Sequence, residues 1–255
     1  YKINNITKYQ KINKGEKYMK KTFLIFSILA IIFGGLGFYF MSNAQEKKVV
    51  HEAKSHKSLT AQINIENQPI IGDPNAPVTM VEFFDLKCPF CLEWKKEVFP
   101  KLKEKYIDTH KAKIVFINAP LKQHGKDAYL GALALEAAYT QNPDASILLI
   151  DELFSYQKDV DKEWLTKDLI AKGASKINNL DVDKLMKDIE DEQVKQAVEK
   201  DRNIARESHL NSTPTLFINN VRVESIVDDN GKEINSNPFD LNKIDSMIKE
   251  ELEKK

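Results

Sequence analysis

The sequence predicts an α/β protein whose small sheet is interrupted by an inserted helical domain and preceded by an N-terminal membrane anchor or signal. Three observations predict this arrangement. Apolar runs of strand length lie before and after residues 125–206, those residues show only helical periodicity, and an uncharged apolar segment lies near the amino end. Because 42% of the 255 residues are hydrophobic, a sizeable core can form.

The amino-terminal part of the chain predicts a membrane-targeting segment. Phe23–Met41 is an uncharged apolar segment of 19 residues. It is longer than the apolar region of a secretory signal, about 7 to 15 residues, and close to the roughly 20 residues that span a bilayer. We therefore expect a signal or anchor at residues 19–44, with a transmembrane helix at 23–41. Cleavage after Ala44 stays open.

Charge fixes the expected orientation of that segment. Residues 1–44 hold seven lysines and one acidic residue, so they carry +6 and the rest of the formally neutral chain carries −6. This asymmetry predicts a cytoplasmic amino terminus and an extracytoplasmic main part, held at the cell membrane by a single anchor. An acidic main part also argues against a nucleic-acid partner. Residues 1–18 resemble neither a domain nor a signal, and we expect Met19 to be the true start.

The hydrophobic pattern predicts the remaining elements in order. Residues 45–61 lack apolar periodicity and predict a linker, whereas Gln62–Ile65 alternates like a short strand. The nearly continuous apolar run Val78–Phe84 predicts a strand covered on both faces. A helix is expected from about Leu92, with a break near Pro100.

The second half of the chain completes the predicted domain. The expected elements are a buried strand at Lys113–Asn118, helices within residues 125–206, a hairpin of Thr215–Ile218 and Val221–Val223, and a closing helix at Leu241–Leu252. The sheet domain would thus comprise residues 62–124 and 207–255, and the helical insertion residues 125–206.

The two cysteines of the chain, Cys88 and Cys91, lie between the first buried strand and the following helix. A disulfide between them closes a loop too small to stabilise a fold. A helix start stabilises a thiolate, so we expect Cys88 to be exposed and to be the nucleophilic thiol. We expect Cys91, one turn further inward, to be the resolving thiol. Half of a zinc site is the alternative, but the chain has no second cysteine pair and its histidines show no matching spacing. We expect no metal at this site.

These features together resemble the DsbA-type branch of the thioredoxin superfamily, in its membrane-anchored form found in bacteria with a single membrane. The resemblance covers about Ala61 to Glu253 and is carried by the strand before C-P-F-C, the inserted helices, and Thr213-Pro214 before a hairpin and a final helix. It implies a thioredoxin fold and thiol–disulfide exchange. It also implies that no cofactor is required beyond a redox-active Cys88–Cys91 disulfide.

The resemblance assigns roles to further residues. Glu82 would lie beneath the cysteines and assist proton transfer at Cys91; alternatively it faces solvent or pairs with a lysine. Thr213-Pro214 would form a cis peptide bond facing the cysteines, with the Thr213 backbone free to pair with a substrate peptide. A proline that simply starts an edge strand is the alternative.

The residues around the cysteines add chemical detail. Pro89 suits the first turn of a helix and stiffens the ring. Phe90 stands where strong oxidants of the family often carry histidine, so it either weakens the oxidant or contacts substrate peptides. Lys87 is expected to be exposed and screened by solvent. Asp85 is expected to be a strand-end or turn residue, and His124-Gly125 the start of a helix, not a catalytic pair.

The function these expectations favour is an extracytoplasmic oxidoreductase that introduces disulfides into exported proteins with free thiols. The resemblance implies reoxidation by a quinone-linked, DsbB-like membrane thiol oxidase, and we expect a monomer. The alternatives are a reductase or isomerase with the same fold, and a non-catalytic peptide- or metal-binding module. Asp228–Glu233 offers closely spaced oxygen ligands for a structural calcium ion, but a solvated turn is favoured.

Overall fold

The computed structural model describes most of the chain beyond the predicted anchor and linker. The described residues are 59–223, 226–227, 233–235 and 237–254, and they belong to one compact unit. The expected anchor and residues 228–232 of the calcium candidate lie outside them. Among the described residues, no helix combines the length and apolar character needed to cross a membrane.

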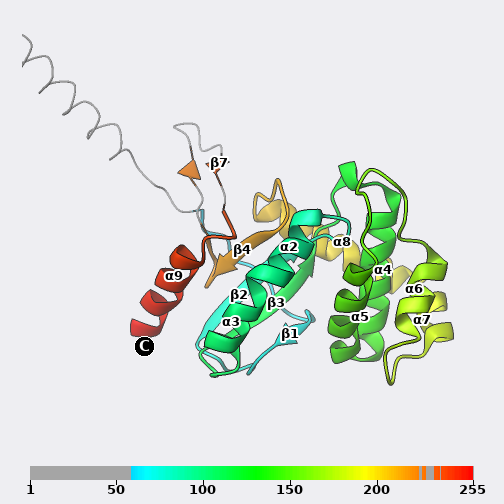
Figure 1. Ribbon diagram of the computed structural model, residues 1–255, viewed down its shortest axis with the longest axis horizontal. Helices are drawn as coiled ribbons and strands as arrows, with labels where there is room; N and C mark the ends of the chain where they lie inside the picture. Colours follow the sequence, from blue (N-terminus) through cyan, green and yellow to red (C-terminus); the bar gives the residue numbers. More distant parts are fainter. Residues whose placement is uncertain (1–58, 224–225, 228–232, 236, 255) are drawn as a thin grey trace, which may run out of the picture. The chain divides into compact units, whose positions relative to one another are not determined.

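A five-stranded sheet forms the centre of this unit (Figure 1). Its order is β1-β3-β2-β4-β5, in which β2 and β3 run parallel and the other neighbours run antiparallel. The strands are β1 (Ile70–Ile71), β2 (Val78–Phe84), β3 (Ala112–Asn118), β4 (Thr215–Ile218) and β5 (Val221–Arg222). A separate antiparallel pair consists of β6 (Ile226–Val227) and β7 (Glu233–Asn235).

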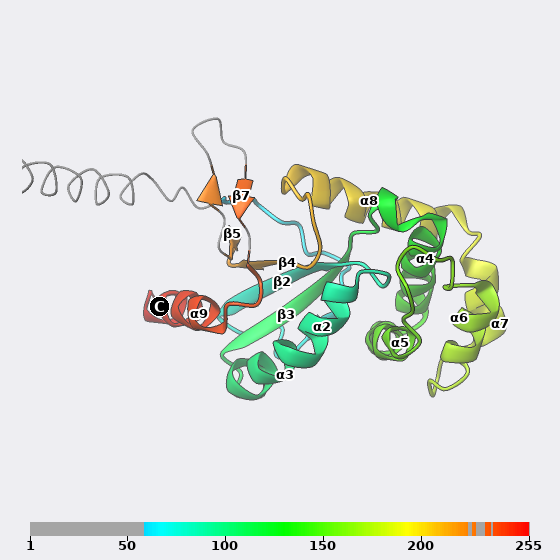
Figure 2. The ribbon, with the colours of Figure 1, turned by 45° about the horizontal axis from the view of Figure 1, so that its top comes forward.

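Helices cover both faces of the sheet. Figure 2 shows α2 and α3 on one side of β2 and β3, with α4 to α7 gathered beyond the strand ends. The helical elements are α2 (Pro89–Glu97), α3 (Phe99–Leu102), a π-helical turn (Lys103–Ile107), a 3₁₀ turn (Lys122–His124), α4 (Lys126–Gln141), α5 (Pro143–Ser155), α6 (Lys167–Ala174), α7 (Val182–Asp188), α8 (Glu192–Glu207) and α9 (Leu241–Glu253).

Alternation along β2 divides the core into two clusters. Met80 and Phe84 point to the larger cluster, which includes buried residues of α2, α4 to α7 and α9. Val81 and Phe83 point to the smaller cluster on the other face, which Ile204 of α8 completes. Glu82 shares the Met80 face because side chains alternate along a strand. The sheet therefore presents this carboxyl to the side on which α2 packs.

Most predicted elements are confirmed. The two buried strands, the hairpin, the helical insertion and the closing helix occur within a few residues of their expected bounds. The helix after the cysteines breaks at Val98, just before Pro100. Asn219 and Asn220 both have positive φ, which a two-residue hairpin turn of this kind requires.

The amino-terminal edge of the sheet differs from the prediction. Gln62–Ile65 is not a strand; Ile63 and Ile65 pack onto the smaller core cluster, and the edge strand is Ile70–Ile71 instead. The predicted linker also runs too far, because Thr60 bridges to β5 and the Arg222 N–H donates to the Leu59 carbonyl at 2.9 Å. The alternation of polar and apolar residues correctly identified which side chains of this segment face the core. It did not show that the segment pairs with no strand.

A buried polar network ties the helical insertion to the sheet. Asp201 of α8 accepts hydrogen bonds from the Gln68 side chain at 2.6 Å and from the Asn118 backbone at 3.1 Å. The Asn118 amide donates to Glu136 of α4 at 2.7 Å. Burial and the Asp201 charge raise the pKa of Glu136 to about 8, and burial raises the pKa of Asp201 to about 6.

Glu136→Gln should flatten the pH dependence of folding stability. The folded state holds these protons more tightly than an unfolded chain, whose carboxyls titrate near 4.5 and 3.8. Stability present at about pH 4 is therefore lost as the pH rises through 6 and 8. In metal-free buffer the variant should gain at least about 1 kcal/mol relative to wild type between pH 5 and pH 9. Urea unfolding at both pH values measures this, and equal slopes for the two proteins would contradict it.

Candidate active site

The C-P-F-C segment lies where β2 ends and α2 begins. Cys88 is the N-cap residue of α2, and Pro89 occupies the first turn, where its missing N–H costs no hydrogen bond. The Cys91 N–H donates to the Cys88 carbonyl at 3.1 Å, and the Cys88 N–H donates to the Asp85 carbonyl at 3.0 Å. The predicted helix start at the cysteines is thus confirmed.

The Cys88 thiol is buried, not exposed as predicted. The residue is 3% exposed, and its Sγ lies 3.2 Å from the Thr213 carbonyl oxygen. A hydrogen bond from the Cys91 thiol lowers the pKa of Cys88 to about 6, with further help from Thr213 and the helix-start N–H groups, against the opposing effect of burial. Near neutral pH the thiolate is therefore the main form of Cys88.

Cys91 has the opposite character. It is fully buried, and the Asp85 N–H lies 3.5 Å from its Sγ. Burial, the hydrogen bond to Cys88 and the Cys88 charge raise the pKa of the Cys91 thiol well above its usual range. The two thiols, which are not joined in this structure, thus form a polarised pair of one thiolate and one neutral thiol.

Glu82 lies under the same helix, in the middle of the sheet between Phe116 and Leu216. It is 2% exposed, so the alternative in which it faces solvent is wrong. Burial raises the pKa of Glu82 well above its usual range; Lys95 opposes this rise and Cys88 adds to it. A neutral carboxyl that can give up a proton therefore lies near the polarised thiols.

Lys95 is the cation that acts against burial to lower the pKa of Glu82. It belongs to α2, and its Nζ lies 2.8 Å from an Asp151 carboxylate oxygen of α5. The same Nζ lies 4.1 Å from the centre of the Phe99 ring, a distance at which an ammonium is attracted to an aromatic face. The helical insertion thus holds the charge that acts on Glu82.

Thr213 and Pro214 face Cys88 from the other side. Their peptide bond is cis, and both residues are buried. The Thr213 carbonyl can accept a hydrogen bond from the Cys88 thiol when that thiol is protonated, and the Thr213 side chain helps to lower the pKa of Cys88. The sequence prediction of a cis bond facing the cysteines agrees with this geometry.

Phe90 is an exposed aromatic residue beside a buried thiol. Its side chain is 58% exposed, and Pro89 next to it is also exposed. Large hydrophobic residues of the described chain are otherwise rarely so exposed; Leu148, at 52%, is the other example. The geometry fits an apolar contact surface at the mouth of the site.

Lys87 corrects a sequence prediction. Its side chain is 2% exposed, and its Nζ lies 2.7 Å from an Asp127 carboxylate oxygen and 3.1 Å from the Lys162 carbonyl. Burial acts to raise the pKa of Asp127, but hydrogen bonds from Lys87 and from two backbone N–H groups outweigh it and lower that pKa. The prediction of an exposed, screened lysine is wrong because the helical insertion folds over this side chain.

The insertion also holds the cysteine loop directly. The Gln157 side chain, just after α5, donates to the Leu86 carbonyl at 2.8 Å and to the Cys88 carbonyl at 3.0 Å. No spacing or motif in the sequence indicated this contact, since the partners lie about 70 residues apart. The predicted helical block is therefore part of the wall of the site.

Asp85 organises the turn before Cys88. One of its carboxylate oxygens accepts the Lys87 N–H at 2.8 Å; the other accepts the Leu121 N–H at 2.9 Å and lies 2.7 Å from Nδ1 of His124. Asp85 is thus a turn residue, as predicted, and Gly125 begins α4 as expected. The sequence missed the pairing of Asp85 with His124 because topology, not spacing, brings them together.

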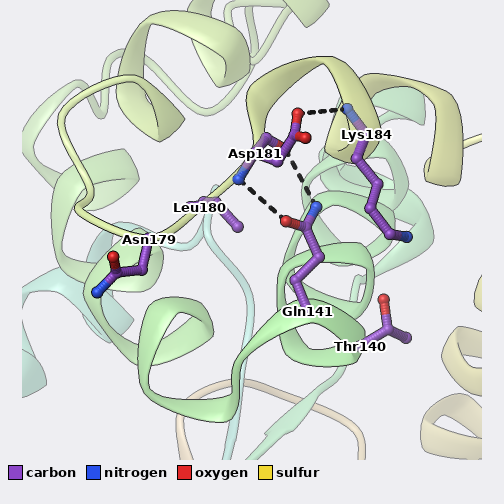
Figure 3. Close-up of a pocket in the computed structure, with 6 residues that line it drawn as sticks. All are labelled: Thr140, Gln141, Asn179, Leu180, Asp181 and Lys184. Carbon is purple, nitrogen blue, oxygen red and sulfur yellow. Dashed lines mark hydrogen bonds between the residues drawn. The ribbon is translucent and has the colours of Figure 1, made fainter.

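A surface pocket lies between the end of α4 and the start of α7. Figure 3 shows Gln141 at the end of α4 exchanging two hydrogen bonds with the Asp181 backbone before α7. None of its lining residues takes part in the cysteine site. Within the described ranges, no group of three or more histidine, cysteine or acidic side chains is arranged to hold a metal ion.

Known proteins are similar to this chain in sequence and in fold. The family model described as thioredoxin matches residues 64–234. The probable disulfide bond formation protein D of Bacillus cereus is 39% identical over 153 residues, which cover 60% of this chain and 70% of that protein. The corresponding protein of Bacillus anthracis is 34% identical over 77% of this chain and 85% of its own length.

Solved structures agree with these relatives. The crystal structure of oxidised BdbD from Bacillus subtilis superposes with a TM-score of 0.67 at 32% identity, covering 77% of this chain and 98% of that chain. The structure of DsbA2 from Pseudomonas aeruginosa gives a TM-score of 0.54 at 27% identity, covering 71% and 92%. The fold described above is therefore shared with solved structures of similar sequence.

Proposed function

Since the chain belongs to the DsbA-type branch of the thioredoxin family and is a thiol–disulfide oxidoreductase, we propose that it donates its Cys88–Cys91 disulfide to exported proteins. The observation that carries this direction is the polarised cysteine pair. A thiolate stabilised at Cys88 lowers the free energy of the reduced form, and a stabilised reduced form makes the disulfide a stronger oxidant.

The first step forms a mixed disulfide. A substrate thiolate attacks Cys88 Sγ, the bond between Cys88 and Cys91 breaks, and its electron pair leaves on Cys91. Because the pKa of the Cys91 thiol is raised, this sulfur needs a proton at once. Glu82, whose pKa burial raises, would give that proton.

The second step releases the product. The second thiolate of the substrate attacks the substrate sulfur bonded to Cys88, and Cys88 leaves as a thiolate. The substrate is oxidised by two electrons, and the enzyme retains both as the Cys88 thiolate and the Cys91 thiol. The hydrogen bonds from Cys91 and the helix-start N–H groups make Cys88 a good leaving group.

A redox titration of the full chain against glutathione tests the direction. We expect a reduction potential well above about −200 mV, as for disulfide donors, and rapid oxidation of a reduced, unfolded substrate protein. A potential near the roughly −270 mV of reducing thioredoxins would overturn the proposal in favour of a reductase.

Glu82→Gln should slow the first step without removing activity. Glutamine keeps the shape and a hydrogen-bond donor but cannot transfer a proton, so mixed-disulfide formation should slow by roughly a hundredfold at pH 7. Stopped-flow measurement of substrate oxidation between pH 5 and pH 9 checks this. Glu97→Gln, on the same helix as the cysteines, serves as a control, and a rate unchanged by Glu82→Gln would rule out the proton transfer.

Phe90→His should make the disulfide more oxidising. Phe90 is exposed and lies two residues after Cys88 in the sequence. A cationic ring at this position would further stabilise the thiolate. The pKa of Cys88 should fall below its wild-type value and the reduction potential should rise. Phe90→Tyr, which adds no charge, should leave both unchanged; an equal shift in the two variants would point to shape instead.

The cellular setting is part of the same proposal. Lysines before Phe23–Met41 and the acidic character of the chain after it support a single anchor and an extracytoplasmic site at the cell membrane. Catalytic turnover then requires a membrane thiol oxidase that passes the electrons on, of the quinone-linked type. Protease treatment of intact cells tests the location, since an extracytoplasmic domain is cleaved and a cytoplasmic one is protected.

A further inference from the structure

A histidine that the exchange reaction does not use lies beside the cysteine loop. His124 ends the 3₁₀ turn after β3, and its side chain is only 13% exposed. Nδ1 of the ring lies 2.7 Å from the Asp85 carboxylate, whose side chain is fully buried. Asp85 in turn accepts the Lys87 N–H and holds the Cys88 N–H through its carbonyl. The imidazole is therefore fixed against the turn that carries the reactive thiol.

The other charges around this turn are already matched. Lys87 is engaged by Asp127 at 2.7 Å, and the backbone of Gly125, next to His124, runs close to both of these groups. That ion pair contributes one positive and one negative charge. Apart from Lys87, the charged groups that act on His124 are the buried Asp85 carboxylate and the Cys88 thiolate. Protonated His124 can balance the carboxylate, so that the thiolate does not face an uncompensated negative neighbour.

We propose that the Asp85–His124 pair is a positioning device that stabilises the Cys88 thiolate and thereby sets how strongly oxidising the Cys88–Cys91 disulfide is. Phe90 provides no charge inside the C-x-x-C segment. The positive charge comes instead from His124, which belongs to a neighbouring loop and is held there by the fold. The inference rests on the proposed role of Cys88 as the leaving thiolate. It holds whichever direction the cell uses for the electrons.

The electrostatic coupling supports this assignment in both directions. The hydrogen bond to Asp85 raises the pKa of His124, and the Cys88 thiolate raises it further, against burial and the Lys87 charge. Coupling between two titrating groups is reciprocal, so protonated His124 must stabilise the thiolate by the same free energy. Oxidation removes the thiolate, and with it this part of the stabilisation of the imidazolium.

The coupling acts in a defined pH window. It requires both a thiolate and an imidazolium, so it is present between the Cys88 pKa of about 6 and the raised pKa of His124. Below that window Cys88 is protonated, and above it His124 is neutral. Any effect of His124 on the reduction potential should therefore be greatest near neutral pH and disappear in alkaline solution. A purely structural role of His124 would not produce this pH dependence.

The first test measures the titration of His124 in the unaltered site. NMR titration of the histidine rings in the oxidised and reduced full chain should give a higher His124 pKa in the reduced protein. His110, whose side chain is 76% exposed, provides an internal control and should titrate identically in both states. His124→Gln identifies the resonance. An equal His124 pKa in the two oxidation states would overturn the inference.

The second test measures the redox equilibrium. At pH 7, His124→Gln should shift the equilibrium constant with glutathione by about three- to tenfold toward the oxidised protein, the effect expected of one partly buried charge. His124→Lys should restore much of the wild-type value, and the His124→Gln difference should vanish at pH 9.5. A shift independent of pH would overturn the inference. A failure of the proposed function can be told apart from a failure of this inference. The proposed function is tested by the absolute reduction potential of the wild type, whereas the inference is tested by the difference between the variant and the wild type.

Discussion

Replacing Cys88 by serine is expected to abolish disulfide exchange, whereas replacing Cys91 by serine should trap mixed disulfides. Cys88 is a thiolate near neutral pH, and Cys91 is a fully buried thiol whose pKa is raised. With Cys88 absent, the remaining thiol is both inaccessible and protonated, so it should react with oxidised glutathione at least a hundredfold more slowly than wild type at about pH 7. Mass spectrometry of the adducts measures both outcomes.

The Cys91 position allows a matched comparison. Serine keeps a hydroxyl that can donate to the Cys88 thiolate, whereas alanine removes the donor that contributes most to its low pKa. Cys91→Ala should therefore raise the pKa of Cys88 above about 6 by more than Cys91→Ser does, as read from thiolate absorbance. Ready adduct formation at Cys91 in the Cys88→Ser variant would contradict the assignment of the two thiols.

The sequence predicted those parts of the fold that depend on local pattern. Val78–Phe84 and the strand at Lys113–Asn118 are mostly apolar because both faces of the central strands are covered. The paired asparagines predicted the hairpin turn because both positions have positive φ. Glu82 was identifiable because a carboxyl in such an apolar run must have a special environment.

The parts that sequence reasoning missed depend on contacts between distant segments. Nothing near Lys87 indicates that Asp127 will lie against it, and nothing near Asp85 indicates His124. The same limit explains why Cys88 was wrongly predicted to be exposed. The Gln157 and Thr213 segments that enclose it lie about 70 and 125 residues away in the sequence. Local pattern locates a reactive group, whereas tertiary packing sets its exposure and its charge.

Asp127→Asn should be the most destabilising single change at the site outside the cysteines. It leaves Lys87 as an unpaired cation in a place where its side chain is 2% exposed. Removing one partner of a buried ion pair typically costs about 3 to 5 kcal/mol, because the remaining charge is neither hydrated nor matched. For a folded unit of this size, that loss corresponds to a fall of roughly 10 °C in the melting temperature.

Two controls separate the unpaired charge from other causes. Glu190→Gln breaks the Lys167–Glu190 pair, whose side chains are 52% and 62% exposed, and should have little effect on stability because solvent screens this pair. The double variant Lys87→Met with Asp127→Asn removes the cation as well, so it should recover most of the stability lost in the single variant. If the double variant were as unstable as Asp127→Asn alone, the cost would come from the hydrogen bonds that Asp127 accepts from the Trp164 and Leu165 N–H groups, not from the charge.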